Sequence, residues 1–226
     1  DSLTCSGCTC AFDSENGIPL LFRPTQGDSS TDKTESVKSF YEEILFPNYD
    51  DLDTGWRLRE KAEKGLFARL LDEQIPLRAK ILDVGCGTGQ FTNFLGSKWG
   101  RTVFGTDISL NSLSLGQRFK QGNEIDNAVF VQMNLLWPVF APESFDLVIC
   151  NGVLHHTSDP FGGFQSISKL VKRGGHIIVG LYNVYGRVAH NLRGFLIKAS
   201  GNRLEFLDPH LRARGIGEPK QHAWYM

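Results

Sequence analysis

The chain has 226 residues, 41% of them apolar, which is enough to bury the core of one sizeable α/β domain with a small addition, but not two full domains. Its formal net charge of −1 gives the whole molecule no basic footprint, so we expect no nucleic-acid partner. No apolar run approaches the roughly 20 residues that cross a bilayer, and no signal peptide opens the chain, so we predict a soluble, cytoplasmic protein without a transmembrane segment.

Cysteine usage favours the same compartment. The five cysteines form a group near the start and two singles beside apolar runs: Cys5, Cys8, Cys10, Cys86 and Cys150. This is not the framework of a disulfide-rich secreted protein, so a reducing setting is expected. The chain opens with Asp1 rather than methionine, which leaves a missing leader open.

Residues 1–22 form a short segment that carries cysteine and glycine. Cys5 and Cys8 make a C-x-x-C knuckle, and CSGCTCAFDSENGIPLLF resembles the second half of a small zinc ribbon. A closed zinc site needs four ligands, and Cys10 alone cannot replace the absent first pair. Either the chain starts partway through the ribbon or the metal site has been lost, so no metal ligands are assigned. Residues 23–34 are polar and read as a linker.

Helical periodicity follows the linker. One face of a first helix is predicted to carry Val37, Phe40, Tyr41, Ile44 and Leu45. A second helix is predicted from Ala62, Leu66, Leu70 and Leu71. Both helices precede the sheet.

From residue 79, short apolar runs alternate with amphipathic segments. The runs AKILDV, TVFGTD, AVFVQM, FDLVIC and HIIVGLY predict strands, and the segments between most of them predict helices. This order indicates an α/β fold, a Rossmann-like doubly wound and mainly parallel sheet with helices on both faces. Ligands bind such sheets at the carboxyl ends of the strands, where this chain places Asp83, Asp107, Asn134 and Asn151.

The first strand leads into a glycine-rich loop, ILDVGCGTGQF. A dinucleotide-binding turn is written G-x-G-x-x-G or G-x-G-x-x-A, but here Gln90 stands at the third small position and the glycine falls at Gly89. An acid, Asp83, ends the strand where a pyrophosphate would be repelled. The spacing D-x-G-x-G-x-G therefore favours a ligand that carries positive charge.

With these residues in view, ILDVGCGTG resembles the first motif of class I S-adenosylmethionine-dependent methyltransferases, and later motifs follow in order over roughly residues 35–185. The resemblance implies S-adenosylmethionine as cofactor, held by the loop, by the acid that ends the second strand, and by the third strand's end near the adenine. The implied binding residues are Asp83, Gly85, Cys86, Gly87, Gly89, Asp107, Ile108, Asn134, Leu135 and Asn151. Asn134 departs from the usual aspartate, although an amide oxygen can also accept from the adenine amino group.

The fourth strand and its exit, FDLVICNGVLHHTSDP, resemble the branch that methylates small molecules, including quinone-type methyltransferases. His155 and His156 lie near the expected methyl group and are candidate general bases, since a histidine accepts a proton near neutral pH. A role in orienting the loop is equally compatible with the sequence.

Several candidates have simpler readings. Asp83 and Asp107 could cap the helices that follow them. Tyr41 and Tyr49 lie where the family often places an N-terminal helix over the cofactor, but a core aromatic and a surface aromatic explain them as well. Cys86 has neither an identified base nor another sign of a lowered pKa, so it is not expected to be a nucleophile.

The C-terminal arm is locally basic, and Val188, Leu192, Phe195 and Leu196 fall on one helical face. It could dock on an anionic or lipid-like surface, or pack on the sheet as an ordinary solvated helix. No convincing strand pair follows the fifth strand. Together with the half ribbon, this predicts a chain without the sixth and seventh strands, either a fragment or a family member with an unusual tail.

The expected organisation is therefore a partial zinc-ribbon-like segment at 1–22, a linker at 23–34, a methyltransferase domain at 35–183 and a basic helical arm at 184–226. The expected reaction is methyl transfer from S-adenosylmethionine to a small organic acceptor. The rivals are a non-catalytic cofactor-binding partner or regulatory protein, a nicotinamide-dependent oxidoreductase, disfavoured by Gln90, and methylation of RNA or protein, disfavoured by the charge.

Overall fold

The computed structural model describes residues 2–4, 9, 11–23, 38–39, 42, 47, 49–50, 52–183 and 185–201. The chain divides into two units, residues 1–181 and 182–226, and each is described by itself. The candidate site lies in the first unit.

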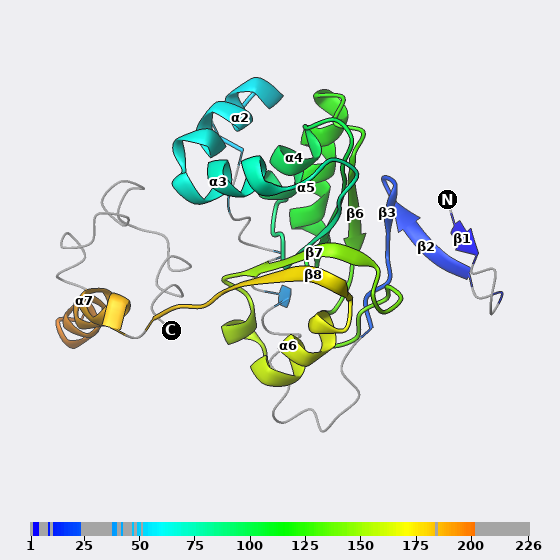
Figure 1. The fold of residues 1–226 in the computed structure, drawn as a ribbon. Helices are drawn as coiled ribbons and strands as arrows, with labels where there is room; N and C mark the ends of the chain where they lie inside the picture. Colours follow the sequence, from blue (N-terminus) through cyan, green and yellow to red (C-terminus); the bar gives the residue numbers. More distant parts are fainter. Residues whose placement is uncertain are drawn as a thin grey trace. The chain divides into compact units, whose positions relative to one another are not determined.

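The first unit is built on a five-stranded parallel sheet with the order β6-β5-β4-β7-β8 (Figure 1). The strands are β4 (Lys80–Val84), β5 (Thr102–Asp107), β6 (Ala128–Gln132), β7 (Phe145–Asn151) and β8 (Val171–Gly180). The order steps outward from β4 in both directions, which is the doubly wound arrangement. The fold class predicted from the alternating pattern is confirmed.

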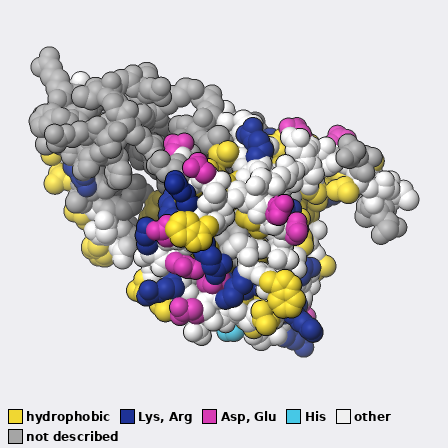
Figure 2. Space-filling model, turned by 90° about the horizontal axis from the view of Figure 1, so that it is seen from above, with side chains coloured by type: hydrophobic (Ala, Val, Ile, Leu, Met, Phe, Trp, Pro, Cys, Tyr) yellow, Lys and Arg dark blue, Asp and Glu magenta, His cyan; other side chains and the backbone are white. Residues whose placement is uncertain are grey.

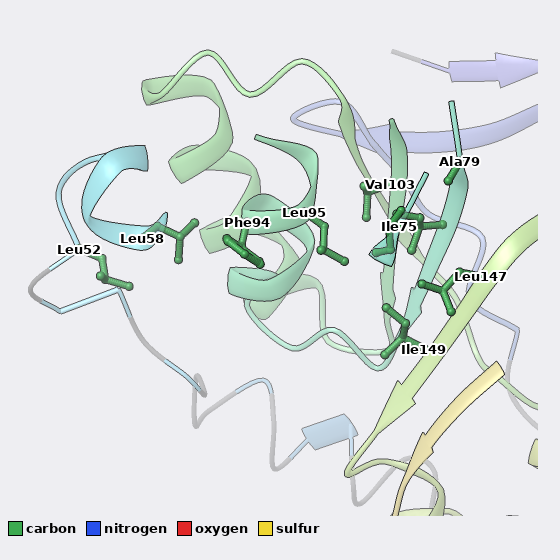
Figure 3. Packing of buried hydrophobic residues seen from close by; sticks show 10 residues of the cluster. Leu52, Leu58, Ile75, Ala79, Phe94, Leu95, Val103, Leu147 and Ile149 are labelled. Atoms are coloured by element: carbon green, nitrogen blue, oxygen red, sulfur yellow. The ribbon is translucent and has the colours of Figure 1, made fainter. Parts of the chain in front are cut away.

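Alternate side chains of the strands build two separate cores. On β4, Ile81 joins one core and Leu82 the other, as the period of two in a strand requires. The first core packs β4, β5 and β7 against α2 (Gly55–Lys64), α3 (Leu66–Gln74) and α4 (Gln90–Gly96), as Figure 3 shows. The second core includes Leu154 and Ile167, the latter from α6 (Pro160–Ser168). With α5 (Leu110–Gly122) against β5 and β6, helices cover both faces of the sheet.

Two sequence predictions are corrected in detail. The helix predicted across residues 62–71 is broken at Gly65, whose φ of −82° and ψ of 120° are extended, so the apolar periodicity spans α2 and α3. The fifth strand begins earlier than HIIVGLY, because the segment before it already pairs with β7 across an irregularity between Phe145 and Leu147.

A buried ion cluster ties α3 to the start of β5. The Asp72 carboxylate accepts from Arg101, from Arg59 at 3.1 Å and from Lys98 at 3.4 Å. The Arg101 side chain is 0% exposed and also donates to the carbonyls of Asp72 and Ile75 at 2.6 and 3.0 Å. Although burial opposes it, the hydrogen bond from Arg101 and the surrounding positive charges lower the pKa of Asp72. The carboxylate is therefore charged throughout the neutral range.

Acidic and basic side chains lie close together on the surface. On the face in Figure 2, basic side chains lie among acidic ones. Along α2, Arg59 pairs with Glu63 at 2.8 Å and Lys64 pairs with Glu60 at 3.0 Å, each one helical turn apart.

The N-terminal residues form small antiparallel strands, β1 (Ser2–Thr4), β2 (Ala11–Glu15) and β3 (Ile18–Pro19). β3 lies against β6 at the edge of the main sheet (Figure 1). Cys5, Cys8 and Cys10 fall outside the described residues, so the zinc-ribbon interpretation stays a prediction.

In the second unit, α7 (Val188–Ala199) confirms the predicted C-terminal helix. Its predicted apolar face is exposed within that unit: Val188, Leu192, Phe195 and Leu196. Within the part of the chain that the structure describes, no helix is long and apolar enough to cross a membrane. Residues 202–226 lie outside it, so the expected lack of further strands stays a prediction, as do the domain boundaries and the cytoplasmic location.

Candidate functional site

The parallel topology brings the predicted residues to one edge of the sheet. Asp83 pairs with Gly105 on β5, and Asp107 pairs with Gln132 on β6. Asn134 follows β6, and Asn151 ends β7 beside Gly180. The carboxyl ends of β4, β5, β6 and β7 thus lie side by side in a continuous row, although the four strands come from separate parts of the chain.

The glycine loop joins β4 to α4 and is closed by tight packing. The backbone N–H groups of Gly85 and Cys86 both donate to the Thr106 carbonyl, at 2.7 and 3.0 Å. Gly89 caps α4 with φ of +72°, a left-handed conformation that favours glycine, and a Cβ there would lie 2.3 Å from the Phe130 ring. The loop therefore needs glycine at position 89 for its own backbone conformation and for its close packing against Phe130.

Asp107 links the glycine loop to α5. Its Oδ2 accepts from the Gly87 N–H at 2.8 Å and its Oδ1 from the Ser109 N–H at 2.9 Å. Burial raises the pKa of Asp107, while these backbone N–H groups oppose the rise. The cap of α5 is Ser109, which accepts from Ser112 N–H at 3.1 Å, so Asp107 holds the turn before the helix rather than capping it.

Asp83 is 5% exposed and lies behind the glycine loop. Its Oδ2 accepts from the Thr92 hydroxyl at 2.7 Å, so it contacts the first turn of α4, whose cap is Gly89. Burial raises the pKa of Asp83 to about 6, and the nearby charge of Asp107 adds to the rise. The carboxyl is mostly ionised at pH 7 and becomes neutral as the pH falls below about 6.

The backbone N–H of Cys86 holds the loop, and the thiol of Cys86 is not expected to react. Its side chain packs against the small core of Ile18, Leu113 and Phe130. Burial raises the pKa of the Cys86 thiol well above its ordinary value, and the charges of Asp83 and Asp107 raise it further. The thiol is therefore neutral at pH 7 and a poor nucleophile.

Asn134 and Leu135, the residues predicted to lie beside the adenine, follow the end of β6. Asn134 is 3% exposed, and Leu135 is buried in the second core, so the side chain of Leu135 anchors this turn. The Ile108 carbonyl, directly after Asp107, accepts from the Gln132 side chain at 2.9 Å. Neighbouring buried contacts thus hold Ile108 and the two residues predicted to lie beside the adenine, Asn134 and Leu135.

The exit of β7 lies against the glycine loop. A Cβ on Gly85 would lie 2.4 Å from Val153, which directly precedes the 3₁₀ turn Leu154–His156. The rings of His155 and His156 are 4.1 Å apart, the first half-buried and the second exposed. Both histidines therefore lie in a turn packed beside the predicted cofactor loop.

Two contacts from the N-terminal region reach the site, and sequence reasoning missed the first. The Glu42 carboxylate accepts from the N–H groups of Leu110 and Asn111 at 2.9 and 3.0 Å, at the start of α5. An acid 68 residues before its partner gives no local signal.

Tyr49 proves to be more than a generic core aromatic. Its hydroxyl donates to the Thr88 carbonyl in the glycine loop at 3.1 Å and accepts from Asn93 at 2.9 Å. Its ring stacks on Phe119 with the centroids 4.3 Å apart, and burial raises the pKa of the phenol. Tyr41 lies outside the described residues.

Part of the chain is similar to known proteins. Residues 82–179 match the family described as "Methyltransferase domain". That range runs from β4, through the glycine loop and Asp107, to β8. Residues 82–179 are therefore similar to a methyltransferase domain.

Relatives of this methyltransferase domain share only part of their length with the chain. A malonyl-[acyl-carrier protein] O-methyltransferase of Paenibacillus sp. is 33% identical over 44% of this chain and 37% of that protein. A ubiquinone biosynthesis O-methyltransferase of Aliivibrio fischeri is 30% identical over 54% of this chain and 49% of that protein. The chain thus spans about a third to a half of the length of these relatives.

Among solved structures, PKMT2 from Rickettsia typhi, in complex with AdoHcy, is 24% identical with a TM-score of 0.51. The match covers 64% of this chain and 30% of that chain. It supports the fold of the methyltransferase domain.

A close approach of α5 to the glycine loop gives a testable consequence. A Cβ on Gly116 would lie 2.5 Å from the Thr88 carbonyl oxygen, which is backbone and cannot rotate away. Gly116→Ala is expected to lower the free energy of unfolding by about 1–3 kcal/mol. By displacing the loop, it should also weaken binding of S-adenosylhomocysteine roughly tenfold, measured by denaturant unfolding and calorimetry.

Gly122 provides the matched control on the same helix. No atom lies within 4 Å of its added Cβ, so Gly122→Ala is expected to be neutral or to gain up to about 1 kcal/mol in stability, with unchanged binding. Equal stability and equal affinity of the two alanine variants would contradict the close packing of α5 on the loop.

Proposed function

We propose that this protein transfers a methyl group from S-adenosylmethionine to a small organic acceptor. The observation that carries the proposal is Asp107, placed at the end of β5 with one oxygen on the Gly87 N–H and the other on the Ser109 N–H. A carboxylate oxygen can accept more than one hydrogen bond, so the Asp107 side chain can bond further donors while it holds these backbone N–H groups. Two carboxylate oxygens side by side suit the two neighbouring ribose hydroxyls of the cofactor.

The other residues fit the same ligand. The glycine loop offers backbone without side chains, and Asp83 provides a negative charge behind it for a positively charged ligand. Asn134 and Leu135 follow β6 at the same edge of the sheet, where the adenine is proposed to lie. Bound there, the cofactor would supply a methyl group on a sulfonium centre, which reacts by in-line displacement. Because Asp83 becomes neutral below about pH 6, the site loses part of its attraction for positive charge in acid.

The methyl acceptor is proposed to bind beside the turn that follows β7. Displacement at the methyl requires positioning of the acceptor and, for a hydroxyl or amine, loss of its proton. His155 and His156 lie in the turn that abuts Gly85 through Val153, and either imidazole can accept a proton at neutral pH. One relative is named as a ubiquinone biosynthesis O-methyltransferase, which supports a small organic acceptor here.

The test is transfer of labelled methyl from S-adenosylmethionine to a panel of small phenols, carboxylic acids and amines. Acceptor-dependent labelling is expected for the unaltered chain. If a histidine is the base, His155→Ala or His156→Ala should lower the rate by roughly 10²–10⁴-fold without changing cofactor affinity. Cofactor binding without labelling of any acceptor would instead favour a non-catalytic, cofactor-binding partner.

A further inference from the structure

The N-terminal segment, residues 11–23, docks on the edge of the methyltransferase sheet. Leu20 forms a parallel bridge with Gln132 on β6, and the Leu21 N–H donates to the Gln132 carbonyl at 3.0 Å. Ile18 is 0% exposed and packs with Leu113 of α5 and Phe130 of β6. The edge strand of the sheet is thereby partly covered by backbone hydrogen bonding and by a buried side chain.

A side-chain contact strengthens this docking. The Gln117 side chain, on α5, donates to the Asn16 carbonyl at 3.1 Å. Within the segment, the Leu20 N–H donates to the Asp13 carbonyl at 2.9 Å, which braces β3 against β2. The segment is thus fixed by several contacts distributed along its length.

The last contact reaches the predicted adenine site. The Asn134 Nδ2 donates to the Arg23 carbonyl at 3.2 Å, and its Oδ1 accepts from the Leu136 N–H at 3.0 Å. An asparagine amide can face either way, and its neighbours decide which end carries the acceptor. A carbonyl only accepts and an N–H only donates, so the two partners select the same orientation. The nitrogen faces the N-terminal segment, and the oxygen keeps one free lone pair.

We infer that the N-terminal segment orients the Asn134 amide so that its oxygen, and not its nitrogen, is presented to the 6-amino group of the cofactor's adenine. This inference rests on the proposed function. It also gives a physical reason for asparagine where the family usually has aspartate, because a carboxylate oxygen would face the Arg23 carbonyl and repel it. Asn134 is in this sense both a binding residue and the point at which the segment acts.

The same segment also supports the ribose side of the site. The Gln132 carbonyl accepts from Leu21, while the Gln132 side chain donates to the Ile108 carbonyl beside Asp107. Gln132 is 7% exposed, so both contacts are shielded from water. Loss of the segment is therefore expected to alter adenine selectivity first and overall affinity second.

The experiment compares two ligands that differ only at the base. Calorimetry measures the affinity for S-adenosylhomocysteine and for S-inosylhomocysteine, in which an oxo group replaces the 6-amino group. Leu21→Pro removes the N–H that bonds Gln132, whereas the matched control Leu21→Ala retains it. The unaltered chain and Leu21→Ala should prefer the adenosyl ligand. Leu21→Pro should lower the ratio of the two affinities by about threefold to tenfold, since only the Leu136 N–H then opposes a turn of the amide nitrogen toward the oxo group.

Asn134→Asp provides the rescue. In the Leu21→Pro background it should restore preference for the adenosyl ligand, because both carboxylate oxygens accept and no wrong orientation exists. A purely structural role for the segment would lower both affinities equally and leave the ratio unchanged, which would overturn the inference. If Leu21→Pro does not fold, Gln117→Ala is read by the same ratio, with a fall supporting the inference and no change overturning it. If the unaltered chain binds neither ligand, the proposed function fails instead.

Discussion

Asp72→Asn is expected to lower the free energy of unfolding by about 3–5 kcal/mol, because it leaves a buried guanidinium without a counter-charge. The Arg101 side chain is 0% exposed. Among the described residues, the Asp72 carboxylate is the only acid with which it forms an ion pair. Two carbonyl contacts remain in the variant, at Asp72 and Ile75, but they carry no net charge. Urea unfolding at pH 7 measures the difference directly.

Asp53→Asn is the matched control for this change. Asp53 pairs with Arg57 at 3.5 Å, but both side chains are more than half exposed, at 77% and 54%. Water screens such a pair, so the control should shift stability by less than about 0.5 kcal/mol. An effect of Asp72→Asn as small as that of the control would show that Arg101 is not held as the structure has it.

The sheet could be predicted from the sequence because each strand carries its own signal. The five apolar runs each match a strand, and the residues that end β4 and β5 follow from where those runs stop. Parallel pairing then brings Asp83 and Asp107 to one edge without further information. The helix break at Gly65 was missed, since apolar spacing continues across it and only the backbone angles record it.

Contacts between distant segments could not be predicted in this way. Glu42 accepts a hydrogen bond from Leu110 at the start of α5, 68 residues later in the chain. Asn134 donates to the carbonyl of Arg23, 111 residues earlier. Neither pair leaves a periodic or spaced pattern in the chain, because each depends on how separate elements dock. The cofactor loop was therefore recognisable, while the residues that brace it and orient its neighbours were not.

Asp107→Ala is expected to weaken binding of S-adenosylhomocysteine by at least about 100-fold. The variant loses both acceptors proposed for the ribose hydroxyls, and a hydrogen bond to a charged group contributes about 1.5–3 kcal/mol. It also leaves the Gly87 and Ser109 N–H groups without their acceptor, which loosens the loop itself. Thermal melting of the variant, recorded alongside, separates lost binding from lost folding.

Parallel calorimetric titrations of S-adenosylhomocysteine into the unaltered chain, Asp107→Ala and Asp126→Ala test the central claim most directly. Asp126 is an exposed acid that precedes β6, away from the carboxyl ends of the strands, and serves as the control. The account predicts equal binding by the unaltered chain and Asp126→Ala, and a loss of at least about 100-fold for a folded Asp107→Ala. Binding of the same strength by all three, or by none, would contradict it.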